Sequence, residues 1–139
     1  MLQFLFDTDH LTLFDHSDLK VWRRFVQEAP GSIGISAVSV EENLRGRLAA
    51  LAKHHGGLLQ VQAYGRLVES LQLFQHFSVV AFDGSCEARS QQLRRLRLKV
   101  GSRDLRIAAV ALVHQLALVT RNRRDFTQVP GLKTEDWST

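Results

Sequence analysis

Short apolar segments alternate with longer segments along the whole chain, and in the longer ones apolar residues recur at helical spacing. Strands that alternate with helices in this way form a mostly parallel sheet with helices on both faces. The pattern therefore predicts an α/β fold. The segments predicted to be buried strands are Gln3 to Phe6, Ser32 to Ile35, Phe77 to Phe82 and Leu116 to Thr120.

Helices are predicted between these strands from their caps and their apolar periodicity. One begins around Thr8 or Asp9, and the next is capped by Ser17 or Asp18 and runs to about Glu28. The later helices are predicted to run from Ser39 to just before Gly56, from Leu58 to Phe74, from Ser85 to about Val100, and onward from a cap at Ser102.

Ser39 and Glu42 have the spacing of a capping box, in which each side chain bonds to the backbone N–H of the other residue. A stripe of apolar residues follows at helical spacing and predicts the buried face of this helix. Glu42 lies roughly opposite that stripe, so periodicity alone does not direct it into a cleft. The stripe is Val40, Leu44, Leu48 and Leu51.

The length of 139 residues and the 45% hydrophobic content predict one domain spanning residues 1–139. Cys86 is the only cysteine, which excludes an intrachain disulfide and suits a reducing, cytoplasmic compartment. The chain reaches Asp7 after six residues without a basic start, so no signal peptide is predicted. No run of about eighteen apolar residues is present, and no membrane span is predicted.

The formal net charge is +4, and the positive charge is clustered. Clusters of this kind contact phosphates and attract nucleic acid over long distances. A solvated helix face explains the same residues equally well. The two clusters are Arg94, Arg95, Arg97, Lys99, Arg103 and Arg106, followed by Arg121, Arg123 and Arg124.

Several carboxylates lie at predicted strand ends or helix starts. Carboxylates without cysteine or histidine partners favour magnesium or manganese, and such ions promote phosphodiester hydrolysis. In parallel sheets ligands bind at the carboxyl ends of the strands, which directs attention to Asp7 and Asn122. The carboxylates are Asp7, Asp9, Glu42, Asp104 and Asp125.

Each of these acids also has a structural explanation. Asp7 or Asp9 can cap a helix, and Glu42 can complete the capping box. Asp104 belongs to a first helical turn, where the helix dipole favours acids, and Asp125 can be a surface charge. No single acid distinguishes a metal site from these alternatives.

The order and local sequence of these segments resemble the PIN-domain nucleases, over nearly the whole chain. Leu5 to Asp9, Ser36 to Gly46 and Gly101 to Ala109 match the motifs of that family. Leu118 to Phe126, together with Val129 to Leu132 and Glu135 to Trp137, looks like the VapC toxin branch. The resemblance implies a three-layer α/β/α sandwich and a toxin of a VapBC-type toxin–antitoxin pair that hydrolyses RNA with carboxylate-bound Mg²⁺ or Mn²⁺.

The resemblance also assigns roles to residues. It implies that Asp7, Glu42 and Asp104 hold the metal, and that Asn122 and Asp125 complete the catalytic site. Glu42, rather than its neighbour Glu41, aligns with the functional glutamate of the family. The resemblance further implies that the hydroxyls of Thr8 and Thr120 lie near the metals or their waters.

Two positions depart from the family pattern. Asp9 stands where the family commonly has asparagine, and Asn43 stands where an apolar residue is more usual. An additional acid at position 9 either strengthens metal binding or disturbs a hydrogen bond that asparagine makes. Neither departure removes a principal ligand.

Partners also follow from the resemblance: an RNA substrate, a VapB-like antitoxin and a second copy of the chain. In VapC-like proteins, the helices before and after the glutamate helix form the antitoxin groove. Core packing is the competing explanation for the large side chains of this region. These are Trp22, Phe25, Tyr64, Leu71, Phe74 and Phe77.

Two other functions remain open. A degenerate PIN domain would bind RNA or a protein without cutting, although such a binder has no use for an acidic cluster beside phosphates. The segment Leu5 to Asp9 also resembles the nucleophile motif of haloacid-dehalogenase-type phosphatases. His10 and Leu11 replace the small turn residues of that motif, and no later paired-aspartate motif is present.

The histidines are predicted to be structural or surface residues. His54 and His55 are adjacent, so on a helix their side chains diverge by about 100° and do not share a metal. The others lack partners at ligand spacing; they are His10, His16, His76 and His114.

Overall fold

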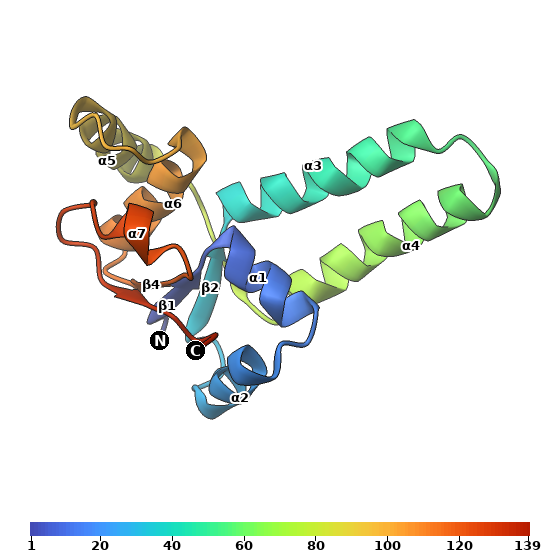
Figure 1. Ribbon diagram of the computed structural model, residues 1–139, viewed down its shortest axis with the longest axis horizontal. Coiled ribbons are helices and arrows are strands. Elements are labelled where there is room, and N and C mark those ends of the chain that lie inside the picture. The colour runs from blue at the N-terminus through green and yellow to red at the C-terminus, as the bar shows by residue number, and fades with distance from the viewer.

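A computed structural model describes all of residues 1–139. Five strands form one parallel sheet in the order β3-β2-β1-β4-β5, with β1 at its centre (Figure 1). The elements follow the chain as β1 (Phe4–Phe6), α1 (Thr8–Asp15), α2 (Leu19–Gln27), β2 (Ile33–Ser36), α3 (Ala37–Lys53), α4 (Gly57–Phe74), β3 (Ser78–Val80), α5 (Gly84–Arg95), α6 (Ser102–Val113), β4 (Ala117–Val119), α7 (Arg123–Phe126) and β5 (Thr134–Glu135).

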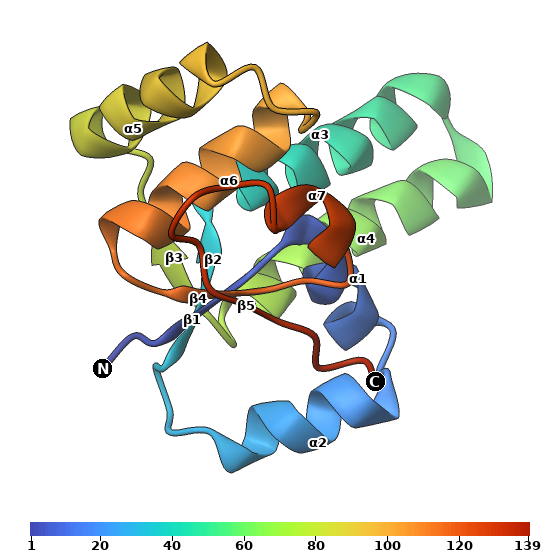
Figure 2. The ribbon, with the colours of Figure 1, turned by 60° about the vertical axis from the view of Figure 1, so that its left-hand side comes forward.

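Both faces of the sheet are buried, as a parallel sheet requires. Side chains alternate along β1, so that Leu5 packs on the face covered by α5 and α6, while Phe4 and Phe6 pack on the opposite face. That opposite face is covered by α1, α2 and the end of α4 (Figure 2). The predicted three-layer α/β/α architecture with a mostly parallel sheet is confirmed.

The four predicted strands are present, each within three residues of its expected ends. The structure adds β5 and the short helix α7, which the pattern did not predict because two- and four-residue elements carry too little periodicity. β5 pairs with β4 at the edge of the sheet. Its residues carry the chain to Trp137, which packs against Phe4 and Phe6.

The capping box at Ser39 is a wrong prediction. The N-cap of helix α3 lies three residues earlier, at Ser36, whose hydroxyl accepts a hydrogen bond from the Val38 N–H. Ser39 is therefore inside the helix, fully buried, with its hydroxyl 3.0 Å from that of Thr8. Glu42 lies one turn into the helix and caps nothing.

Two further helix ends differ from the prediction. Ser102 is the first residue of α6 rather than its cap, and the cap position belongs to Gly101, which makes no side-chain bond. Helix α5 ends at Arg95, not near Val100. After it, Leu98 and Val100 turn back to pack against the core beneath α5 and α6.

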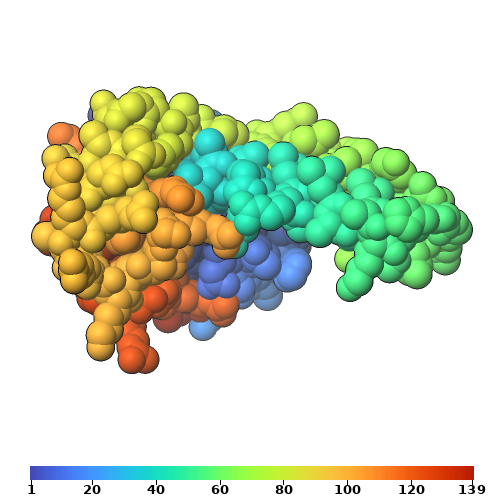
Figure 3. All heavy atoms as spheres, turned by 90° about the horizontal axis from the view of Figure 1, so that it is seen from above, coloured from blue at the N-terminus to red at the C-terminus, as the bar shows by residue number.

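Helices α3 and α4 pack along each other as a hairpin that projects from the body of the molecule, which we call the arm (Figures 1 and 3). Only the base of α3 contributes to the core, through Val40 and Leu44, whereas Leu48 of the predicted buried stripe is 56% exposed. No helix of the chain is both long enough and apolar enough to cross a membrane.

Gly34 lies in β2, where the sheet leaves no room for a side chain. A Cβ atom there would lie 2.9 Å from the Ser78 carbonyl oxygen of the neighbouring strand and 3.1 Å from Val80 Cγ2. We expect Gly34→Ala to lower the free energy of unfolding by about 1–3 kcal/mol, because it overpacks the sheet. Gly65→Ala in α4, where nothing lies within 4 Å, is the matched control and should raise it by about 0.5–1 kcal/mol. Urea denaturation measures both, and equal effects would contradict the prediction.

Candidate active site

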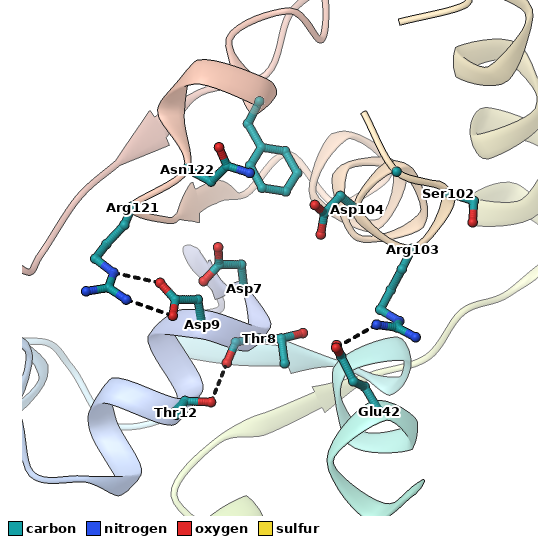
Figure 4. Close-up of a pocket in the computed structure, with 12 residues that line it drawn as sticks. Asp7, Thr8, Asp9, Thr12, Glu42, Ser102, Arg103, Asp104, Arg121 and Asn122 are labelled. Carbon is teal, nitrogen blue, oxygen red and sulfur yellow. Dashed lines mark hydrogen bonds and ion pairs between the residues drawn. The ribbon is translucent and has the colours of Figure 1, made fainter. Parts of the chain in front are cut away.

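The carboxyl ends of β1 and β4, the second turn of α3 and the first turn of α6 surround one open pocket of about 840 Å³ (Figure 4). Only one of its lining residues is hydrophobic, in contrast to the two apolar cores beneath it. The pocket brings together side chains more than one hundred positions apart in sequence. It is lined by Asp7, Thr8, Asp9, Thr12, Glu42, Gly101, Ser102, Arg103, Asp104, Arg121, Asn122 and Phe126.

Asp7 ends β1 and begins α1. Its Oδ1 atom accepts a hydrogen bond from the His10 N–H at 2.7 Å, so the carboxylate is the N-cap of α1. Asp7 is only 5% exposed. The structural and functional explanations of this residue are therefore compatible, since a capping carboxylate also lines the pocket.

Asp104 faces Asp7 across the pocket from the first turn of α6 (Figure 4). Partial burial raises the pKa of Asp104, and the negative charges of Asp7, Glu42 and Asp125 raise it further. The Arg103 guanidinium opposes this shift in pKa. The site therefore concentrates negative charge around a carboxyl that is partly removed from water.

Glu42 projects from α3 toward Arg103 rather than into a cap. Its Oε1 atom accepts a hydrogen bond from Arg103 Nη1 at 2.6 Å, and its Oε2 atom is buried without a hydrogen-bond partner. Glu41, by contrast, is exposed and pairs with Arg45 one turn along the helix. The structure thus directs Glu42 and not Glu41 into the pocket.

Asn122 follows β4 and caps α7. Its Nδ2 atom donates to Asp125 Oδ2 at 2.9 Å, and its Oδ1 atom accepts from the Asp125 N–H at 3.4 Å. Asn122 lines the pocket, whereas Asp125 lies behind it and does not. Thr120 also lies outside the pocket, because its fully buried hydroxyl accepts the Asn122 N–H at 2.9 Å.

Asp9, the acid that stands where asparagine was expected, forms an ion pair with an arginine. Arg121 donates to both of its oxygens, through Nε at 2.7 Å and Nη2 at 3.0 Å. This ion pair lies at the exposed mouth of the pocket (Figure 4). The pattern alone did not identify Arg103 and Arg121 as partners of site acids, because each contact joins residues more than sixty positions apart.

The donor set suits a hard divalent cation. Asp7, Glu42 and Asp104 offer carboxylate oxygens to one pocket, and the buried, unpaired Oε2 atom of Glu42 is a polar group that lacks a partner. In the structure no three histidine, cysteine or acidic side chains are close enough together to enclose a metal ion. The arginines that hold Glu42 and Asp9 instead supply the positive charge.

Comparisons with known proteins find similar sequences and folds. The family model described as PIN domain matches residues 5–132. The tRNA(fMet)-specific endonuclease VapC of Shigella flexneri is 39% identical over 64 residues, which is 43% of this chain and only 48% of that relative. The match thus spans about half the length of the relative.

Solved structures match over almost the whole chain. VapBC bound to DNA, from Salmonella typhimurium, superposes with a TM-score of 0.79 at 25% identity and covers 99% of both chains. The structure of VapBC2 from Rickettsia felis, bound to a DNA fragment from its promoter, has a TM-score of 0.77 at 22% identity. The match covers 98% of this chain and 99% of that chain.

Because its carboxylate is crowded by like charges, Asp104 should destabilise the metal-free fold. We expect Asp104→Asn to raise the free energy of unfolding at pH 7 by on the order of 0.5–1 kcal/mol, a modest gain since partial exposure screens the repulsion. The raised pKa means that ionised Asp104 lowers stability fully above that pKa, and that this penalty shrinks as the pH falls toward the ordinary pKa of an aspartate. The gain should therefore shrink as the pH falls.

Chemical denaturation in EDTA between pH 4 and 8 measures this difference. Asp15→Asn, which removes the same charge from the exposed end of α1, is the matched control and should give no gain. A variant at position 104 that is no more stable than the wild type at pH 7 would contradict the prediction.

Proposed function

Because the chain belongs to the PIN domain family, we propose that it is a divalent-metal-dependent endoribonuclease, the toxin of a VapBC-type toxin–antitoxin pair. The observation that carries the proposal is the convergence of Asp7, Glu42 and Asp104 on one polar pocket at the carboxyl edge of the sheet. The sequence similarity to an endonuclease VapC and the match to the VapBC structure from Salmonella typhimurium support it. Residues 1–139 would form a single nuclease domain.

Asp7, Glu42 and Asp104 would hold Mg²⁺ or Mn²⁺. Such an ion, when bound, acts as a Lewis acid on the phosphate and makes water a stronger nucleophile at neutral pH. The chain's own contribution is to hold these carboxylates in place: the α1 cap fixes Asp7, and Asp125 orients the Asn122 amide at the pocket wall. Hydrolysis would leave a 5′-phosphate and a 3′-hydroxyl.

Arg103 and Arg121 would change partners when substrate and metal enter. Each now neutralises a site carboxylate from a position at the pocket wall, with side chains 40% and 50% exposed. With Glu42 serving as a metal ligand, the Arg103 guanidinium would be free to bind an RNA phosphate through two donors. Arg121 would bind phosphate at the mouth of the pocket in the same way.

The RNA would approach over the rim formed by the end of α5, the start of α6 and α7. The basic side chains of this rim are exposed, which suits phosphate contacts and long-range attraction. They are Arg94, Arg95, Arg97, Lys99, Arg106, Arg123 and Arg124.

One observation favours a second candidate function. The carboxylates Glu42 and Asp9 are already neutralised by arginines, and no three acids enclose a metal position. A degenerate domain that binds RNA without cutting it would have this arrangement. The haloacid-dehalogenase hypothesis loses its support, because the family match assigns the Leu5 to Asp9 segment to a PIN domain.

The test is cleavage of total RNA by purified protein with Mg²⁺ or Mn²⁺, with EDTA, and by variants. Removing a group that hydrogen-bonds a metal ligand typically lowers metal affinity or activity about 10–100-fold. Removing a ligand itself should therefore lower the cleavage rate at least about 100-fold. We therefore expect EDTA, Asp7→Asn and Glu42→Gln to abolish cutting. Glu41→Gln is the matched control, since its carboxylate faces solvent, and it should cut like the wild type.

Sequencing the RNA ends would identify the target and show whether 5′-phosphates are formed. Cutting that survives EDTA or Glu42→Gln would overturn the metal-dependent mechanism. A folded protein that binds RNA and never cuts it would establish the degenerate binding domain instead.

We further propose that a VapB-like antitoxin covers α4 and that the chain forms a homodimer. Along α4 four large apolar residues recur at spacings of three, four and three, which places them on one side of the helix, and all are more than half exposed. Surface of this kind marks an interaction site. The four residues are Val61, Tyr64, Val68 and Leu71. Two of the large residues near this helix, Phe74 and Phe77, are in the core, as core packing predicted.

Val68→Asp should prevent a tagged chain from co-purifying with its co-expressed antitoxin, because it places a charge in the apolar stripe. Its thermal stability should not change, since Val68 is 52% exposed. Val79→Asp, an equally exposed valine on the edge strand β3, is the matched control and should still co-purify. Retention of the antitoxin by Val68→Asp would place its binding site elsewhere.

A further inference from the structure

His10 is a fully buried polar residue in the first turn of α1, directly behind the pocket. Its exposed fraction is 0%, and the ring packs edge-on against Phe6 at 5.6 Å between centroids. An apolar side chain would fill this position at lower cost, because burying a polar ring requires partners for both nitrogens. The contacts of the two ring nitrogens therefore indicate what the residue does.

The Nε2 atom of His10 is bound to the C-terminal segment. It accepts a hydrogen bond from the Trp137 N–H at 3.3 Å, and the Asp136 carboxylate lies 3.7 Å from the same atom. Asp136 is itself engaged by the N–H and hydroxyl of Ser138. Because Nε2 accepts this hydrogen bond, Nδ1 is the ring nitrogen left to act as a donor.

The Nδ1 atom faces the pocket acid. It has no hydrogen-bond partner, and its near neighbour is Asp7 Oδ1 at 3.7 Å. The same Oδ1 atom accepts the His10 backbone N–H at 2.7 Å. The backbone N–H of His10 thus bonds this carboxylate oxygen, the ring nitrogen lies close to the same atom, and Oδ2 of Asp7 remains for the pocket that Asp7 lines.

We propose that His10 is a positioning residue for Asp7, which orients the carboxylate for a divalent cation and links it to the C-terminal segment through Trp137. The inference rests on the proposed function, since it assumes that Asp7 holds the cation. A buried donor nitrogen held beside the Asp7 carboxylate limits the orientations that the carboxylate can take. Partners behind a metal ligand orient it in this way in other metal sites.

The contact between the C-terminal segment and β1 supports the same role. Trp137 packs against Phe4 and Phe6 at 5.0 and 5.3 Å between ring centroids. That packing fixes the backbone N–H that holds His10 Nε2. The ring is therefore held from one side by the C-terminal segment and directs its other nitrogen to Asp7.

Two variants separate the two nitrogens. Asparagine has its amide nitrogen at the same number of bonds from the backbone as Nδ1, and glutamine has its amide oxygen at the same number of bonds as Nε2. His10→Asn can therefore keep the donor toward Asp7, while His10→Gln can keep the acceptor for Trp137. Both variants should lower the free energy of unfolding, so stability alone does not distinguish them.

The experiment is a titration of each full-length protein with Mn²⁺ alone, followed by electron paramagnetic resonance, with urea denaturation in EDTA as the stability readout. We expect His10→Gln to raise the Kd for Mn²⁺ about 10-fold. His10→Asn should remain within about 3-fold of the wild type. Val21→Ala, which removes buried apolar atoms from the same core without touching Asp7, should lower stability and leave the Kd unchanged.

The outcomes distinguish this inference from the proposed function. Wild-type protein that binds Mn²⁺ and cleaves RNA, with a His10→Gln variant of equal Mn²⁺ affinity, would overturn the positioning role and leave the nuclease intact. Equal losses of affinity in His10→Asn and His10→Gln would show that the histidine is only structural. Wild-type protein that binds no Mn²⁺ would overturn both.

Discussion

Like charges held together at the carboxyl edge of a parallel sheet are the constraint on which the rest of this structure depends. Asp7 and Asp104 reach one pocket because β1 ends there and α6 begins there. Partial burial strengthens the repulsion between their carboxylates. Water cannot screen this charge fully. The surrounding elements must therefore supply hydrogen-bond donors and positive charge, and the helix caps, the arginines and the buried histidine all do so.

These compensating groups are of two kinds. The α1 N-terminus and His10 are rigid, because they are held by the helix and by Trp137, and they act on Asp7 from behind. Arg103 and Arg121 are partly exposed side chains that reach Glu42 and Asp9 from the pocket wall, and they can exchange one anion for another. A fixed carboxylate with exchangeable counter-ions suits a site that binds charged ligands.

The arm and the body differ in how far their apolar side chains are buried. In the body, apolar side chains of β1, β2 and β4 are buried on both faces, whereas along α4 the residues far from the sheet remain exposed. Two paired helices bury too little surface to cover their own apolar sides. The surface that we assign to a protein partner therefore lies on the projecting arm (Figures 1 and 3), whereas the pocket that we assign to RNA lies at the carboxyl edge of the sheet.

The sequence by itself determined the layers and the order of elements, since alternation of short apolar strands and periodic helices is a local property. It also indicated Asp7, Glu42, Asp104 and Asn122, through local motifs that resemble a family. Only the tertiary structure decided which groups meet. The Ser39 capping box was wrong because Ser36 caps the helix and leaves Ser39 buried. His10 looked like an isolated histidine because its partner Trp137 is 127 positions away, a separation at which spacing carries no signal.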